Sequence, residues 1–521
     1  PFLWAIESLD SVADRRVALT AVWHVLLLGL VAQLGLLFDV QRRAYLGGSA
    51  LILASFLANL VLARQFSTVQ TELLALQLLG LVCAGFLAVL VYRLLRRTES
   101  ARVAVLAGGA TSLVLPIGFW VSIPKRHVLV ATILVAILYA FARSRSTGAQ
   151  YWFPWLGPVP VFRASAYALV GLLAWVHAAE AIFVFLVFLL VDLPTAPKND
   201  ARTLAFLAGA FFLSLLPFFL TNGLITGDPL QPPRTLTPAG ATNSRFDALR
   251  KSREAASAGG GFGAIPGYEI FEKVLWIWVL VWGQVSDSLA QFRDVDAVVA
   301  TWFRSGSLES LAEGGLPEFR AINLSVFESA PILASIVAGA RSAVSGWTTS
   351  LRDRIRATDG LAVGLILAFV LLYMQQLPSH VQVTVRHLLP IFPVALYLCA
   401  RQRVVGRLVH AHRGLVQWSY LAVVLFGTQL VLAYVVSEGL SVSAAAQLHG
   451  ILGLTAAVVL TISLVVSAFD ARARYLAAIS LGVAAGLGTA FILLTGIAYF
   501  SFIGQYVLPI SQAVADLIGT I

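Results

Sequence analysis

The chain has 521 residues, of which 59% are hydrophobic and 12% are charged, and its formal net charge is +10. A hydrocarbon span needs about 20 mostly apolar residues, and this chain supplies many such stretches, so its composition excludes a soluble domain. Its two cysteines, Cys83 and Cys399, lie in apolar segments, which excludes a disulfide framework. Arginines in cytoplasmic loops explain the positive charge, so we expect no nucleic-acid partner.

Apolar segments that could cross a membrane recur along the chain. They lie near residues 19–38, 44–63, 71–94, 102–121, 127–143, 163–176, 179–193, 202–221, 328–345, 361–377, 386–401, 415–437, 444–468 and 473–500. The segments 163–176 and 179–193 are both short, and the alternative interpretation is that they form one long, kinked helix. The predicted fold class is all-α, a polytopic transmembrane helical bundle of about twelve to fourteen spans.

Basic residues beside these segments predict the orientation. They form six groups, at 93–102, 143–145, 198–202, 352–356, 401–413 and 472–474. With the spans above, all six groups fall on one side, which the positive-inside rule makes cytoplasmic. The long polar loop, the turn at His177, the turn at 378–386 and the C-terminal tail then lie on the extracytoplasmic face.

One long polar interruption divides the chain. We predict an N-terminal transmembrane bundle at 1–221, an extracytoplasmic loop at 222–327 and a C-terminal transmembrane bundle at 328–521. Loops of this length tend to be functional or disordered. Within the loop, the short apolar run 268–284 contains three tryptophans, which favour the headgroup region and predict an interfacial helix.

The turn that contains Lys125, Arg126 and His127 carries positive charge on the predicted extracytoplasmic face. Because this runs against the usual charge bias, the turn needs a reason for its cations. The functional interpretation is an anion site for the phosphate or diphosphate of a lipid carrier. The alternative is a solvated turn that contacts lipid headgroups.

Two further turns on that face contain candidate residues. His177 and Glu180 are three residues apart on one helical face, and ionisable groups near membrane depth are functional candidates. His380, Arg386 and His387 flank the start of the segment 386–401, where Arg386 could bind a phosphate in bidentate fashion. The alternative for His177 and Glu180 is a polar pair that satisfies backbone groups at a helix end. The alternative for Arg386 is an anchor at a helix end.

Two aspartates complete the candidates. Asp228 lies between Gly227 and Pro229, so we expect it chiefly to shape the loop, with substrate contact as the alternative. Asp39 is a catalytic carboxylate only if segment 19–38 runs outward and 44–63 is a juxtamembrane helix; otherwise it is a boundary residue. The chain begins with Pro1 rather than Met, so we expect its natural N-terminus to lie upstream.

Three segments of the chain carry recognisable motifs. They are Asn222 with Gly227-Asp228-Pro229, similar to an Asn followed by Gly-(Asn/Asp)-Pro; Glu328-Ser329-Ala330-Pro331-Ile332-Leu333, loosely similar to SPxLL; and Arg386-His387-Leu388-Leu389-Pro390-Ile391-Phe392-Pro393, similar to RYLLPxxP. Together they resemble the motifs of the GT-C glycosyltransferases, polytopic enzymes that use polyprenyl-phosphate sugars and include protein mannosyltransferases and the lipid A aminoarabinose transferase. The resemblance covers roughly residues 71–403, and the chain as a whole is also similar to uncharacterised archaeal membrane proteins.

The resemblance implies displacement at the anomeric carbon of a polyprenyl- or dolichyl-phosphate sugar, with a carboxylate as general base and cations that stabilise the departing phosphate. The acceptor would be a protein or a glycan at the extracytoplasmic face of a prokaryotic cytoplasmic membrane, with the long loop as a cover over the site. Some family members use a divalent cation, for which the sequence shows no clear ligand set. The expected phosphate-binding residues are Lys125, Arg126, His127 and Arg386, and the expected substrate-positioning residues are His177, Glu180, Asp228, His380 and His387.

The chain departs from the family pattern because no Asp-Glu or Glu-Asp pair precedes Thr71. Either a segment upstream of Pro1 carries the catalytic acid, Asp39 substitutes for it, or the chain keeps the fold without the activity. A transporter or flippase of lipid-linked material is a second hypothesis, and it predicts two pseudo-symmetric halves with interrupted spans, which the sequence does not display. A non-catalytic membrane subunit of a larger assembly is the third.

Overall fold

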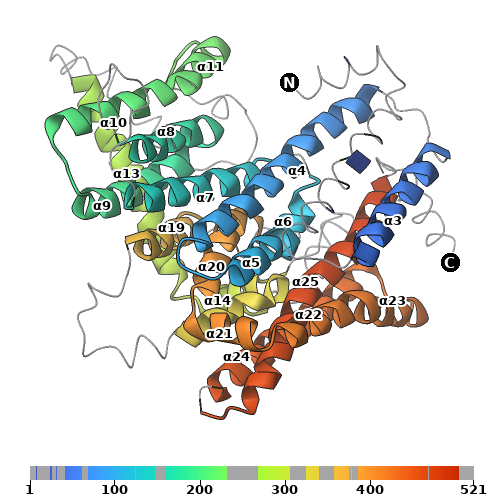
Figure 1. Cartoon of the computed structure of the whole chain (residues 1–521). Coiled ribbons are helices and arrows are strands. Elements are labelled where there is room, and N and C mark those ends of the chain that lie inside the picture. Colours follow the sequence, from blue (N-terminus) through green and yellow to red (C-terminus); the bar gives the residue numbers. More distant parts are fainter. Residues whose placement is uncertain are drawn as a thin grey trace. The chain divides into compact units, whose positions relative to one another are not determined.

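The computed structural model describes most of the predicted helical segments. The described residues are 42–61, 68–123, 125–146, 160–230, 268–304, 324–339, 357–374, 377, 385–467 and 469–503, with isolated residues between 8 and 31. Every regular element in these ranges is a helix (Figure 1). Contacts divide the chain into unit 1, residues 1–132, 302–346 and 381–521, and unit 2, residues 133–301 and 347–380. Asp39, His380 and nearly all of segment 19–38 lie outside the described residues.

Many of these helices could span a membrane. By length and composition, seven could do so, or eight if one bent pair is a single span. The seven are Ala75–Leu95, His127–Ser144, Ala178–Thr195, Ala201–Thr226, Arg413–Ser437, Ser443–Val466 and Ala473–Thr495, and the bent pair is Arg386–Ala400 with Arg403–Ala411. Shorter apolar helices are Tyr45–Ala58, Ala101–Leu113, Val161–Val176 and Ala357–Tyr373. The predicted all-helical, multi-pass class is confirmed, and the predicted span count included helices shorter than a full crossing.

Unit 1 contains the helices at both ends of the chain. They are α3 (Arg42–Val61), α4 (Thr68–Leu95), α5 (Ala101–Leu113), α6 (Leu115–Trp120), the start of α7 (His127–Ser144), α16 (Val326–Ser329), the 3₁₀ helices η3 (Pro331–Gly339) and η5 (Arg386–Ile391), α20 (Phe392–Ala400), α21 (Arg403–Ala411), α22 (Arg413–Ala422), the π-helix η6 (Val423–Gly427), α23 (Thr428–Ser437), α24 (Val442–Val466) and α25 (Ala473–Ile503). Helix α25 packs along α22 and α24, and α4 packs along α5 (Figure 1).

Close backbone approach fixes one of these contacts. A Cβ added to Gly453 of α24 would lie 2.4 Å from the carbonyl oxygen of Glu328 in α16. No side chain fits at that distance, so the glycine lets α24 pass directly against the backbone of α16, as small residues do between membrane helices.

Unit 2 contains the rest of α7, then α8 (Val161–Val176), α9 (Ala178–Thr195), α10 (Ala201–Ser214), α11 (Leu216–Thr226), α13 (Tyr268–Gln291), α14 (Val295–Trp302) and α19 (Ala357–Tyr373). The alternative of a single kinked helix across 163–193 is wrong. His177 is extended (φ −160°, ψ 100°), and α8 and α9 fold back on each other. The rings of Tyr167 and Phe188 are 4.9 Å apart across this hairpin.

Prolines interrupt several segments that we expected to be continuous. Segment 102–121 is two helices, α5 and α6, which meet at an extended Val114, and Pro116 lies in the first turn of α6. Segment 386–401 begins as η5, with Pro390 inside it, before α20 starts. Proline lacks a backbone N–H and clashes with the preceding turn, so regular helices restart around it.

The loop segment 268–284 is helical, as predicted, but the helix α13 continues to Gln291. It packs against α19, and the Gln284 side-chain amide donates to the Leu372 carbonyl oxygen at 2.7 Å. Its position at the membrane interface remains a prediction.

Contacts within each unit join basic groups that were predicted to share one side. In unit 1, Arg401 forms an ion pair with Glu99 at 2.7 Å, and the rings of His412 and Tyr475 are 4.6 Å apart. These contacts connect the groups at 93–102, 401–413 and 472–474. In unit 2, Arg145 and Arg163 donate to the Asp192 carboxylate, and Arg163 also donates to the Lys198 carbonyl oxygen.

Candidate functional site

The turn between α6 and α7 is held against α4. The Gln77 side-chain amide donates to the Ser122 carbonyl oxygen at 2.9 Å. A Cβ added to Gly80 would lie 2.3 Å from the Val121 carbonyl oxygen, so only glycine allows α4 to approach this closely. The turn therefore presents Lys125 and the residues after it from a fixed backbone.

This turn meets the start of η5 in unit 1, and together they form the turn cluster: Lys125, Arg126, His127, Arg386 and His387. The rings of His127 and His387 are 5.7 Å apart in an edge-to-face arrangement, and Arg386 Nε donates to His387 Nε2 at 3.4 Å. The Lys125 ammonium lies 5.0 Å from the centre of the Trp120 ring. The structure thus gathers all four predicted phosphate-binding residues, and His387 with them.

The turn cluster concentrates positive charge. Burial lowers the pKa of Lys125, and the charges of Arg386 and then Arg126 lower it further. Cations that repel one another in this way are stabilised by a bound anion. Planar guanidinium groups and a lysine ammonium are the side chains that bind phosphate best, so the arrangement fits a phosphate group.

His177 and Glu180 form a second polar site, in unit 2. The Glu180 side chain is 1% exposed, and its Oε1 accepts a hydrogen bond from the Tyr373 hydroxyl. His177 Nδ1 lies 3.6 Å from that oxygen and accepts the Glu180 backbone N–H at 3.3 Å, so it caps α9. Sequence reasoning missed Tyr373, because 193 residues separate it from Glu180.

The Gly227-Asp228-Pro229 turn closes α11. Gly227 has φ 78° at the C-cap, where glycine is favoured. Asp228 is exposed, and its Oδ1 accepts the Leu230 backbone N–H at 2.9 Å. The Asn222 side chain is buried and donates to the Pro229 carbonyl oxygen at 3.2 Å. Asp228 therefore shapes the turn, as expected, and its contact with substrate remains a prediction.

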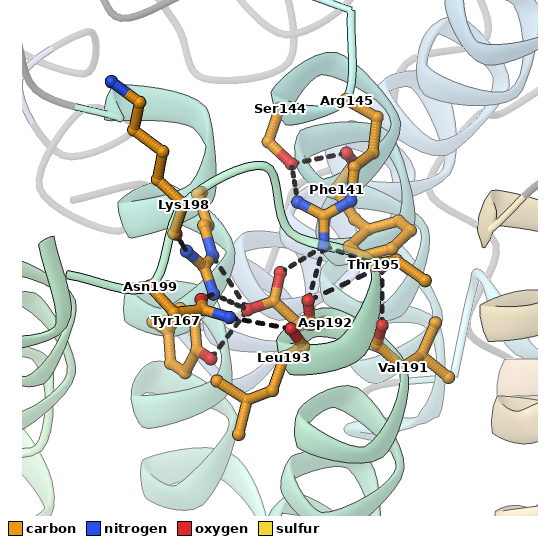
Figure 2. A network of polar contacts seen from close by, with 11 residues as sticks. Phe141, Ser144, Arg145, Tyr167, Val191, Asp192, Leu193, Thr195, Lys198 and Asn199 are labelled. Atoms are coloured by element: carbon orange, nitrogen blue, oxygen red, sulfur yellow. Dashed lines mark hydrogen bonds and ion pairs between the residues drawn. The ribbon is translucent and has the colours of Figure 1, made fainter.

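A network around Asp192 was not anticipated (Figure 2). The carboxylate of Asp192 is fully buried. It accepts hydrogen bonds from Arg145 Nη2 at 2.6 Å, from Arg163 Nε at 2.8 Å and from the Tyr167 hydroxyl at 2.9 Å. Arg163 also donates to the Lys198 carbonyl oxygen and to Asn199 Oδ1, both at 2.8 Å. The network ties together the ends of α7, α8 and α9, at the end of the hairpin opposite His177.

Glu328 is a second fully buried carboxylate, in unit 1. Its Oε1 accepts Arg304 at 2.7 Å, and its Oε2 accepts the Ser325 backbone N–H at 2.8 Å in a capping box. Both oxygens are engaged in holding α16, which gives the SPxLL-like segment a structural role. Within the described ranges, no group of three or more His, Cys, Asp or Glu side chains could hold a metal ion.

Comparisons with known proteins found only distant similarity. No protein-family model matches the chain, and no curated protein matches it. Two solved structures are similar: ArnT from Cupriavidus metallidurans bound to undecaprenyl phosphate, with 13% identity and a TM-score of 0.38, and ArnT in the apo state, with 14% and 0.35. The alignments cover 82% and 83% of this chain, which spans 65% of either ArnT chain. TM-scores this low do not establish a shared function.

Proposed function

We propose that this chain is a membrane glycosyltransferase that moves a sugar from a polyprenyl-phosphate donor to an acceptor. One observation carries the proposal: the turn cluster gathers Lys125, Arg126 and Arg386, with two histidines, at the ends of apolar helices. A phosphate on a lipid chain matches both features, because its charge meets the cations while its hydrocarbon chain stays in the membrane. The motif resemblance of the segments around Asn222 and Arg386 supports the same class.

In the proposed reaction, an acceptor oxygen forms a bond to the anomeric carbon while the bond from that carbon to the phosphate oxygen breaks. The lipid phosphate leaves with the bonding electron pair, and the acceptor proton goes to a base. Negative charge grows on the leaving phosphate, and fixed cations in a site of low dielectric stabilise that charge in the transition state. We assign this role to Lys125, Arg126 and Arg386.

The base that takes the acceptor proton is assigned from the sequence. Asp39 is the carboxylate that the sequence offers for this step. Glu180 accepts the Tyr373 hydroxyl and lies beside His177, and we assign both Glu180 and His177 to positioning of the substrate. His177 and Glu180 fall on the predicted extracytoplasmic face, where the turn cluster is also expected.

The test uses the purified full chain, a set of synthetic polyprenyl-phosphate sugars and a membrane extract as the source of acceptors. Mass spectrometry follows the free polyprenyl phosphate that transfer releases. We expect sugar-dependent release, slowed at least about tenfold in Arg386→Gln, because a hydrogen bond to a charged group contributes about 1.5–3 kcal/mol. Arg293→Gln, which changes an exposed arginine of unit 2, should keep the wild-type rate.

Two outcomes would overturn the transferase proposal. Binding of the donors without release of polyprenyl phosphate would indicate a non-catalytic subunit. Movement of intact donor across a vesicle bilayer, with its sugar–phosphate bond unbroken, would indicate a flippase. Equal release by wild type and Arg386→Gln would remove the turn cluster from the mechanism.

A further inference from the structure

The axis of helix α21 turns away from the axis of the preceding η5–α20 segment. It is bent by 71° from the η5–α20 segment. Val405, Leu408 and Val409 are buried, while Arg403 and Arg407 are exposed, one helical turn apart. An amphipathic helix that turns away from a span in this way is typical of the membrane interface.

Exposed polar side chains of α21 and of the segment 96–102 lie together. They form the α21 surface, which we define as Arg96, Arg102, Arg403, Arg407 and His410. Arg102 Nη1 lies 3.4 Å from His410 Nδ1, and an ion pair of 2.7 Å between Arg401 and Glu99 ties the two parts of the chain together. The segments 93–102 and 401–413 contain eight arginines and a single acidic residue, Glu99. The surface therefore has a large excess of positive charge.

The neighbouring aromatic residues place this surface at headgroup depth. Trp418 of α22 is 72% exposed and Tyr475 of α25 is 56% exposed. The Tyr475 ring contacts His412, which directly follows α21. Tryptophan and tyrosine are enriched at the boundary between lipid tails and headgroups. Arg96 directly follows the candidate span Ala75–Leu95, at the same boundary.

The α21 surface is separate from the turn cluster. Arg386 begins η5 and Arg403 follows α20, so the two sites lie at opposite ends of one helical segment. Six residues of 3₁₀ helix and nine of α-helix span about 25 Å, which approaches the thickness of the hydrocarbon core. A membrane crossing by this segment puts the two sites in opposite leaflets.

We propose that the α21 surface binds the headgroups of anionic phospholipids in the leaflet opposite the turn cluster. Guanidinium groups pair with headgroup phosphates, and clusters of arginine beside a span are attracted to anionic lipid. A lipid fits better than a soluble anion because α21 lies against the bundle at headgroup depth, with its apolar face buried. The bound lipids hold α21 in the interface.

The test measures binding of a fluorescent phosphatidylglycerol to the full chain in neutral detergent micelles, with phosphatidylcholine as the reference lipid. The variant Arg403→Gln/Arg407→Gln removes two cations, and Arg293→Gln, which changes an exposed arginine of unit 2 outside the basic groups beside the spans, is the control. At low salt we expect the first variant to bind phosphatidylglycerol about 30-fold more weakly, because each basic residue near the surface contributes about fivefold. The control should bind as the wild type does.

A conservative variant separates charge from folding. Arg403→Lys/Arg407→Lys keeps both charges, so its affinity for phosphatidylglycerol should lie within a few-fold of that of the wild type. A loss of affinity as large as that of the glutamine variant would contradict the proposal. Equal binding of the two lipids by the wild type, or unchanged binding in the glutamine variant, would overturn it. Displacement of the lipid by inorganic phosphate or by an acidic peptide at micromolar concentration would identify a soluble partner and overturn it too.

Discussion

Replacing Asp192 by Asn tests whether the buried network holds the α7–α9 helices together. The change keeps the size and shape of the side chain but removes its negative charge. Asp192 accepts hydrogen bonds from Arg145 at 2.6 Å, Arg163 at 2.8 Å and Tyr167 at 2.9 Å. The variant leaves two guanidinium groups beside a neutral amide, which can satisfy only part of their hydrogen bonds.

The exposure of the three charged side chains sets the expected loss in the free energy of unfolding. Asp192 is 0% exposed, Arg163 3% and Arg145 14%. Removing one partner of a buried ion pair costs about 3–5 kcal/mol, whereas an exposed pair contributes about 0–1 kcal/mol. Since two arginines depend on the same carboxylate, we expect Asp192→Asn to lower the free energy of unfolding by about 3–5 kcal/mol.

The assay is equilibrium unfolding of the purified chain in mixed micelles, followed by circular dichroism. Tyr167→Phe, which removes one neutral donor to the carboxylate, should cost about 1.5–3 kcal/mol. Asp296→Asn, which changes an exposed aspartate of α14 in the same unit, is the matched control and should unfold as the wild type does. The double variant Asp192→Asn/Arg163→Met should lose less than the sum of its single changes, because it also removes a stranded charge. A loss below about 1 kcal/mol in Asp192→Asn would refute the reasoning.

Three further predictions concern the turn cluster and the packing beneath it. Gly80→Ala places a methyl group against the Val121 carbonyl oxygen, so we expect about 1–3 kcal/mol of lost stability and weaker phosphate binding; Gly85→Ala in the same helix meets nothing within 4 Å and should change neither measurement. Gly453→Ala should cost a similar amount, about 1–3 kcal/mol, through the contact of α24 with α16, and a wild-type unfolding curve would contradict that contact. Lys125→Gln should keep or raise thermal stability at pH 7 while phosphate affinity falls. The pKa of Lys125 is lowered in the folded state, so the charged lysine opposes folding below its unfolded pKa, and the stability gain should disappear as pH rises toward 10.5. Lower stability of Lys125→Gln than of the wild type at pH 7 would contradict the predicted sign of the stability change.

The turn cluster could be predicted because its signal is local. Lys125 and Arg126 stand out as cations between two apolar segments, and Arg386 stands out at the start of another. The positive-inside rule placed all three on one face before any contact was known. The seat of the Lys125 turn on α4 depends on Gly80, whose importance becomes visible only in the packing of α4 against the turn.

The networks that the sequence did not reveal depend on distant partners. Asp192 and Arg163 each lie at the end of an apolar segment, which is a signal for ionisable groups near the membrane. That signal does not say that they meet, because the pairing needs the hairpin at His177. The same holds for Tyr373, which reaches Glu180 only when α19 packs on α9.

Binding of polyprenyl phosphate is the most direct test of the proposed function. We would compare the Kd of the purified chain for a fluorescent polyprenyl phosphate with that for the matching polyprenol, which has no phosphate. The proposal predicts at least about tenfold tighter binding of the phosphate by the wild type, and no preference in Lys125→Gln/Arg386→Gln. Equal affinity of the wild type for both lipids, or an unchanged preference in the double variant, would contradict it.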